Sequence, residues 1–171
     1  MNTTLRVVAL SLMSVAVLAG CKKNTKTQTP PPAVEPPPAM TQPTTNAGAY
    51  GPSDLDTDAC LRQRVVYFDL DQDAVKPEFQ AIMACHAKYL NDRPSARINL
   101  EGNTDERGSR EYNMGLGERR GNAVSSALQA AGGSASQLSV VSYGEERPVC
   151  TESTEECWAK NRRVEIVYTA K

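Results

Sequence analysis

Proline is distributed very unevenly along this chain of 171 residues: eight of its eleven prolines lie before residue 53. The segment 21–57 contains most of them, is rich in Thr, Gln and Ala, and has almost no bulky apolar side chains. Such a segment cannot bury enough surface to offset the entropy lost on ordering it. We therefore predict a Pro/Thr-rich tether with local polyproline II character over 21–57 and one folded domain over 58–171.

The first twenty residues have the pattern of an export signal. Arg6 gives a positive start, and residues 7–18 form an apolar stretch that is too short to span a bilayer as a mature helix. The sequence LAGC that ends at Cys21 resembles the lipobox of bacterial lipoproteins. By that resemblance, 1–20 are a cleaved signal peptide and Cys21 carries the acyl chains, palmitate among them. An ordinary signal peptide followed by an unrelated cysteine is the alternative.

Residue 22 bears on which membrane the chain would reach. It is Lys22 rather than aspartate, and in the sorting rule that this sequence resembles, aspartate retains a lipoprotein in the inner membrane. We therefore expect a lipid anchor in the outer membrane with the domain facing the periplasm.

The composition excludes several classes of function. The formal net charge is −1, and the chain without residues 1–20 keeps 18 basic and 20 acidic residues. Aromatic residues make up only 5% of the chain. Neither figure suits a nucleic-acid surface. The chain has one histidine and no CxxC sequence, so we expect neither a metal site nor a cofactor.

Four cysteines remain if Cys21 is acylated: Cys60, Cys85, Cys150 and Cys157. An even number in an exported protein indicates disulfides, and four cysteines can pair in three ways. We prefer the local pairing, in which Cys60–Cys85 joins the start of the domain to its first helix and Cys150–Cys157 closes a small loop.

Hydrophobic periodicity in the domain predicts strands that alternate with helices. Strands are expected at 65–68, 97–101, 138–143 and 164–168, and helices at 77–90, 110–131 and 154–160. The βαβαβαβ order favours a two-layer α/β sandwich, in which a mixed sheet is covered by helices.

Polar residues are concentrated in a few short motifs of this domain. They are YFDLD at 67–71, EGNTDERGSREYN at 101–113, LGERRGNAV at 116–124, VSYGEERP at 141–148 and KNRRVEIVY at 160–168. In this order the motifs are similar to those of the peptidoglycan-associated lipoproteins of the OmpA-like C-terminal domain family. The resemblance covers the whole of 65–171, and the lipobox and the tether also fit it.

The resemblance implies non-covalent binding of peptidoglycan through the diaminopimelate of its stem peptide. It places the family's acid on Asp105 and its arginine on Arg120. A carboxylate suits the ammonium group of diaminopimelate, and a guanidinium suits its carboxylate. Both residues are expected to be exposed. The resemblance adds supporting contacts from five further residues: Leu70, Asp71, Asn113, Leu116 and Arg162. Leu70 stands where the family usually has an aromatic side chain, which alters the apolar wall.

Each of the two central residues also has a plain structural interpretation. Asp105 could merely order its loop, and Arg120 could pair with Glu118 or Glu111 on the surface of its helix.

The resemblance further implies a tether between the outer membrane and the cell wall. It suggests the periplasmic propeller protein TolB and other Tol proteins as partners, in the Tol–Pal system that acts in envelope integrity and cell division. One alternative is a related lipoprotein that tethers the envelope without TolB.

A remote alternative is a glycan hydrolase that uses two of the acids Glu101, Asp105, Glu106 and Glu118. Their arginine-rich surroundings would keep these acids ionised, which disfavours the enzyme.

Overall fold

The computed structural model describes residues 48–171. The expected signal peptide, Cys21 and most of the expected tether lie outside these residues. The described elements are α1 (Asp54–Thr57), β1 (Val65–Tyr67), α2 (Gln80–Asp92), β2 (Arg97–Asn103), α3 (Arg110–Ala130), β3 (Leu138–Gly144), α4 (Glu155–Asn161) and β4 (Arg163–Ala170), with 3₁₀ turns at Pro77–Phe79 and Ala135–Gln137.

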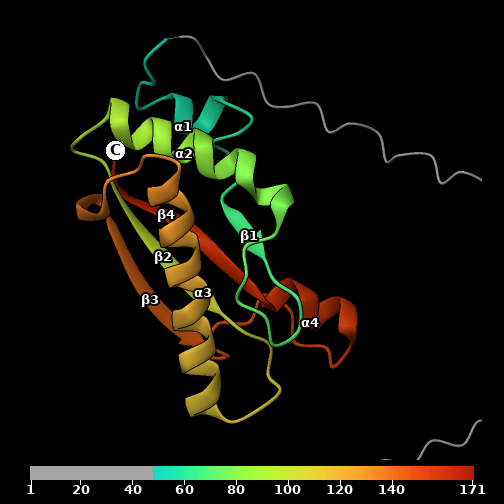
Figure 1. Cartoon of the computed structure of the whole chain (residues 1–171). Helices are drawn as coiled ribbons and strands as arrows, with labels where there is room; N and C mark the ends of the chain where they lie inside the picture. The colour runs from blue at the N-terminus through green and yellow to red at the C-terminus, as the bar shows by residue number, and fades with distance from the viewer. Residues whose placement is uncertain (1–47) are drawn as a thin grey trace, which may run out of the picture. The chain divides into compact units, whose positions relative to one another are not determined.

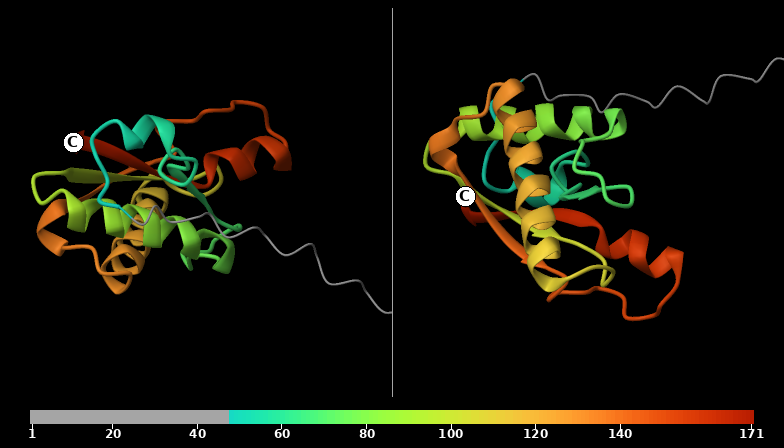
Figure 2. Two further views of the ribbon diagram at one scale, coloured as in Figure 1. Left: turned by 90° about the horizontal axis from the view of Figure 1, so that it is seen from above. Right: turned by 60° about the horizontal axis from the view of Figure 1, so that its bottom comes forward.

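The four strands form one mixed sheet in the order β1-β4-β2-β3. β4 is antiparallel to both of its neighbours, whereas β2 and β3 are parallel. Leu100 in the centre of β2 lies opposite Ile166 on one side and Val140 on the other. α2 and α3 cover the same face of the sheet, and α4 lies at the end where β4 begins (Figures 1 and 2). The predicted fold class and the order of strands and helices are confirmed.

Close packing brings α3 directly against the sheet. A Cβ atom on Gly102 of β2 would lie 2.0 Å from the carbonyl oxygen of Gly117, so only glycine fits here. The start of α3 is fixed by Ser109, whose hydroxyl accepts a hydrogen bond from the backbone N–H of Tyr112 at 3.2 Å. The first turns of α3 are therefore held beside the loop that follows β2.

The folded domain begins earlier than the sequence predicts. Tyr50 and Leu55 are buried in the hydrophobic core, and the backbone N–H of Tyr50 donates to Asp92 Oδ2 at 2.9 Å. The predicted boundary at residue 58 is therefore wrong. Two isolated apolar side chains in a polar, proline-rich segment do not alter its average composition, yet they are enough to dock it on α2.

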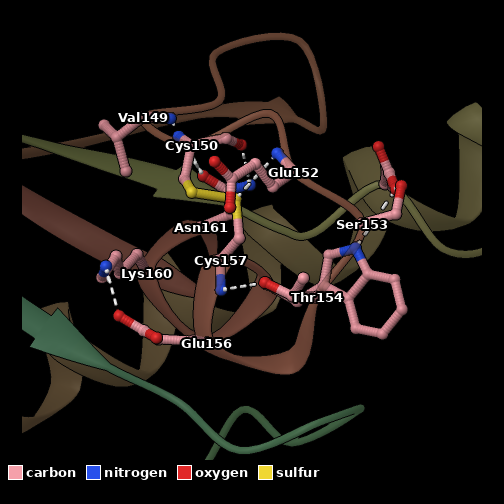
Figure 3. The surroundings of a disulfide bond; sticks show 11 residues. Val149, Cys150, Glu152, Ser153, Thr154, Glu156, Cys157, Lys160 and Asn161 are labelled. Carbon is pink, nitrogen blue, oxygen red and sulfur yellow. Dashed lines mark hydrogen bonds and ion pairs between the residues drawn. A yellow bond between two sulfur atoms is a disulfide. The ribbon is translucent and has the colours of Figure 1, made fainter.

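Both disulfides have the predicted pairing. Cys60–Cys85 joins the segment before β1 to α2, and Cys150–Cys157 closes the loop that leads into α4. Figure 3 shows that Asn161 holds the second loop as well: its side chain accepts from the backbone N–H groups of Val149 and Cys150 and donates to the carbonyl of Cys150. The position of α4 is therefore fixed by a covalent bond and by three hydrogen bonds.

Candidate functional site

A cavity of about 320 Å³ opens between the loop after β1, the loop after β2, the first turns of α3 and the residue that links α4 to β4. It is lined by all seven residues that the sequence singled out: Leu70, Asp71, Asp105, Asn113, Leu116, Arg120 and Arg162. Four further residues line it: Thr104, Arg107, Gly108 and Tyr112.

Asp105 is buried in the wall of this cavity and is only 4% exposed, so the expectation that it is exposed is wrong. Its Oδ1 accepts hydrogen bonds from the backbone N–H of Arg107 at 3.1 Å and from Nε of the same residue at 3.2 Å. Its Oδ2 accepts from Arg107 Nη2 at 2.7 Å and from Arg162 Nη1 at 3.2 Å. Burial alone would raise the pKa of Asp105, but these hydrogen bonds outweigh it and the pKa is lowered. Asp105 is therefore an anion at neutral pH.

Arg120 is fully buried, which contradicts the expected exposed position. Its guanidinium donates to the carbonyl oxygens of Gln72 at 2.8 Å, Asn103 at 3.0 Å and Asp69 at 3.1 Å. Burial lowers the pKa of Arg120 to about 10, so it still carries its charge at neutral pH. The side chain thus fastens the loop after β1 to the end of β2. The alternative that Arg120 is a solvated residue that pairs on the surface of its helix is therefore wrong.

The rim of the cavity joins the loop after β1 to α3. Asp71 has a φ of 58°, in the left-handed region that non-glycine residues seldom adopt. Its carboxylate accepts a hydrogen bond from the Tyr112 hydroxyl. Leu70 and Tyr112 are large apolar side chains that remain 52% and 44% exposed, so they form an open apolar rim.

The floor of the cavity contains two buried polar residues. Asn113 is 1% exposed, and its Nδ2 donates to the carbonyl of Arg107 at 3.2 Å. Thr104 is 3% exposed, and within residues 48–171 its hydroxyl has no hydrogen-bond partner. A buried hydroxyl without a partner is costly, so Thr104 is available to a polar ligand atom.

Residues 67–162 match the model of the OmpA family, which is more than half of the chain. The chain belongs to the OmpA family.

Curated relatives that carry the name peptidoglycan-associated lipoprotein include proteins from Pseudomonas putida and Pasteurella multocida. The protein from Pseudomonas putida is 52% identical over 122 residues, which cover 71% of this chain and 72% of the relative. The protein from Pasteurella multocida is 39% identical over 155 residues, covering 91% of this chain and 92% of the relative.

Solved structures agree with this assignment. The peptidoglycan-associated lipoprotein from Burkholderia pseudomallei matches with a TM-score of 0.66 and 43% identity, covering 68% of this chain and 98% of that one. The C-terminal domain of MotB from Helicobacter pylori matches with a TM-score of 0.57 and 28% identity, covering 63% and 84%.

In this OmpA-family domain, α4 supports the cavity from outside. Arg162 donates to the carbonyl of Phe68 at 3.1 Å and to Glu155 Oε1 at 2.6 Å, besides its bond to Asp105. Trp158 lies under the guanidinium of Arg107, with 4.1 Å between the guanidinium carbon and the ring centroid. Its indole N–H donates to Glu106 at 3.2 Å, and the Ser153 hydroxyl donates to the same carboxylate oxygen. The loop that carries Asp105 is thus anchored on α4.

Arg107 lines the cavity and pairs with Asp105, but the sequence motifs did not single it out. It lies two positions after Asp105, and an acid and an arginine at that spacing in a loop can pair locally. That signal was available but could not show that Arg107 lines the cavity. With Arg107 included, the lining residues carry three guanidinium groups and two carboxylates, those of Asp71 and Asp105.

Residues 48–171 lack two further features. No helix in this range is long and apolar enough to cross a bilayer. No group of three or more His, Cys, Asp or Glu side chains in it could hold a metal ion.

Proposed function

We propose that this chain is an outer-membrane lipoprotein that binds peptidoglycan non-covalently, with the diaminopimelate of the stem peptide in the cavity around Asp105. Membership of the OmpA family and the names of its relatives support an association with peptidoglycan. The observation that carries the proposal is that a buried anion, Asp105, and a buried cation, Arg120, line one cavity.

The chemistry of the cavity suits the far end of diaminopimelate, which bears an ammonium and a carboxylate on one carbon. Asp105 provides the negative charge for the ammonium, and the guanidinium groups provide donors for the carboxylate. The hydroxyl of Thr104 offers one more polar contact, and Leu116 and the Leu70 rim can cover the methylene groups. A volume of about 320 Å³ is at the small end for ligand sites, as a single side chain requires.

The same cavity argues against hydrolysis of glycans. Glu101, Glu106 and Glu118 do not line it. Of the two carboxylates that do, Asp105 is held ionised by arginines, and a retaining or inverting glycosidase needs a protonated acid. The residues therefore favour binding without cleavage, and analysis of muropeptides released from sacculi checks this directly.

The anchor and the partners of this proposal come from the sequence. Acylated Cys21 would hold the chain in the outer membrane, and the tether would let the domain reach the wall. TolB and the Tol–Pal system, with their role in cell division, follow from the family resemblance alone. A pull-down of periplasmic proteins with the chain tests this partner, and the absence of TolB would favour the tethering lipoprotein that acts without it.

Sedimentation with purified sacculi tests the wall site. Asp105→Asn keeps the size of the side chain and removes its charge, so we expect binding to weaken about tenfold or more, the loss of one charge-assisted hydrogen bond. Asp73→Asn is the matched control, because Asp73 is a half-buried acid that pairs with Arg119 and does not line the cavity. Equal binding by the two variants would reject the site.

A further inference from the structure

The carboxylate of Asp105 has no free acceptor position in this structure. Four donors reach it: the backbone N–H, Nε and Nη2 of Arg107, and Nη1 of Arg162. A carboxylate offers about four lone-pair sites, so these donors occupy all of them. An ammonium group can bond to Asp105 only if one of the donors leaves.

Arg107 is the arginine that can leave. The side chain of Arg162 is 7% exposed and also donates to the carbonyl of Phe68 and to Glu155. The side chain of Arg107 is 32% exposed. If Arg107 releases Asp105, the bond from Arg162 remains, so the buried carboxylate is never left without a cation.

A released Arg107 side chain has other partners within reach. Its guanidinium lies over the ring of Trp158, and its Nη2 lies 3.6 Å from Glu155 Oε2. Both partners belong to α4, which the Cys150–Cys157 disulfide and Asn161 hold in place. The guanidinium therefore stays at the edge of the cavity that it already lines, where it faces an incoming ligand.

We propose that Arg107 is an exchangeable internal cation: the ligand's ammonium takes its place on Asp105, and the released guanidinium binds the ligand's carboxylate. This inference rests on the proposed function and adds a basis for selectivity. A ligand that brings only an ammonium breaks the Arg107–Asp105 pair and gives Arg107 no new carboxylate. A ligand that carries both an ammonium and a carboxylate breaks the Arg107–Asp105 pair but forms two new ones, between its ammonium and Asp105 and between its carboxylate and Arg107. Arg107 is thus a specificity residue for a zwitterionic end group.

Two synthetic stem tetrapeptides that differ only at the third residue test the exchange. One contains meso-diaminopimelate and the other L-lysine, which keeps the distal ammonium and lacks the distal carboxylate. Calorimetry with the full chain in detergent should show that the wild type prefers the diaminopimelate peptide by about tenfold or more. Arg107→Ala should bind the lysine peptide severalfold more tightly than the wild type does and lose most of the preference.

Two further variants separate exchange from a structural role. Arg107→Lys keeps a mobile cation and should retain part of the preference, although it cannot form the bidentate pair with Asp105. If Arg107 served only to hold Asp105 in place, Arg107→Lys and Arg107→Ala would show the same preference between the two peptides. Arg110→Ala is the matched control, since Arg110 is exposed, pairs with Glu146 and does not line the cavity.

Trp158 is the single tryptophan of the chain and provides an independent signal. Its fluorescence should change when the wild type binds the diaminopimelate peptide, because the guanidinium over its ring changes its ion-pair partner from Asp105 to the ligand, and should not change when Arg107→Ala binds it. A constant signal in the wild type contradicts the exchange.

The outcomes distinguish this inference from the proposed function. If the wild type binds neither sacculi nor the diaminopimelate peptide, both are wrong. If the wild type binds both sacculi and the diaminopimelate peptide, but Arg107→Ala keeps the preference or loses affinity for both peptides by the same factor, only the exchange is wrong. A melting curve of each variant shows whether it folds. If Arg107→Ala does not fold, Arg107→Lys decides: if its ratio of affinities for the diaminopimelate and lysine peptides equals that of the wild type, the exchange is wrong.

Discussion

Replacing Arg120 by alanine should destabilise the domain far more than an ordinary change of a charged helix residue. The side chain is fully buried and donates to three backbone carbonyls, those of Asp69, Gln72 and Asn103. Removing it leaves these acceptors without their charged donor, and each such loss costs about 1–3 kcal/mol. The energy of burying a guanidinium is recovered and offsets part of this sum. We expect a net loss of about 3–5 kcal/mol in the free energy of unfolding.

Urea denaturation of the disulfide-intact protein measures this quantity, because the free energy of unfolding falls linearly with urea concentration. Arg119→Ala is the control: Arg119 is the neighbouring residue, its side chain is 50% exposed, and it pairs with Asp73 on the surface. The control should lose less than about 1 kcal/mol. A loss in Arg120→Ala that is as small as in the control would refute the structural role that we assign to Arg120.

This prediction also changes how a binding experiment on Arg120 must be interpreted. Loss of sacculus binding in Arg120→Ala would follow from release of the loop that carries Leu70 and Asp71, whether or not the guanidinium contacts the ligand. Asp105→Asn is therefore the more direct test of the site.

Further predictions concern other parts of the domain. Burial lowers the pKa of His86 from 6.5 to about 4. The neutral imidazole therefore stabilises the fold fully above pH 6.5, and this contribution is lost as the pH falls towards 4. The free energy of unfolding, measured as a function of pH, should fall by about 3 kcal/mol in this range, and this fall should be absent in His86→Gln. Gly102→Ala should lower the melting temperature by several degrees, because its Cβ would meet the backbone of α3. A fragment of residues 58–171, which lacks α1, should melt below a fragment of residues 48–171. Cys21→Ser should move the chain from the detergent phase to the aqueous phase on phase separation.

The order of the strands and helices could be predicted because each element carries its own local pattern. Over part of β2 and β4 buried side chains alternate with partly exposed ones, and Ser109 and Thr154 cap the helices that follow them. The cavity could be located because its motifs resemble those of a known family. In both cases the information lies within a few consecutive residues.

The burial of Arg120 could not be predicted in this way. Two of its acceptors, Gln72 and Asp69, lie 48 and 51 positions earlier in the chain, so nothing near Arg120 indicates them. A charged residue is rarely buried unless it is paired, and the usual expectation therefore favours the surface. Leu116 lies one turn earlier, and Val124 and Leu128 lie one and two turns later, all buried on the same stripe of α3; this spacing is the local hint that the stripe faces the core.

The Cys60–Cys85 bond also determines how the domain would carry mechanical load. The described chain begins beside the C-terminal end of α2, where Lys88 donates to the carbonyl of Gly48, whereas the cavity lies at the N-terminal half of α3. A membrane anchor that pulls on residue 48 while the wall holds the cavity would stretch the domain between these two points.

Under such tension the segment before Cys60 can peel away, but the disulfide stops the peeling there and transfers the force to α2. β1, a three-residue strand at the edge of the sheet, follows the disulfide in the chain and precedes the Leu70 loop. The covalent bond would thus shield this short strand and the cavity wall behind it from the pull, so under the proposed function the cavity would keep its shape while the N-terminal segment partly unravels.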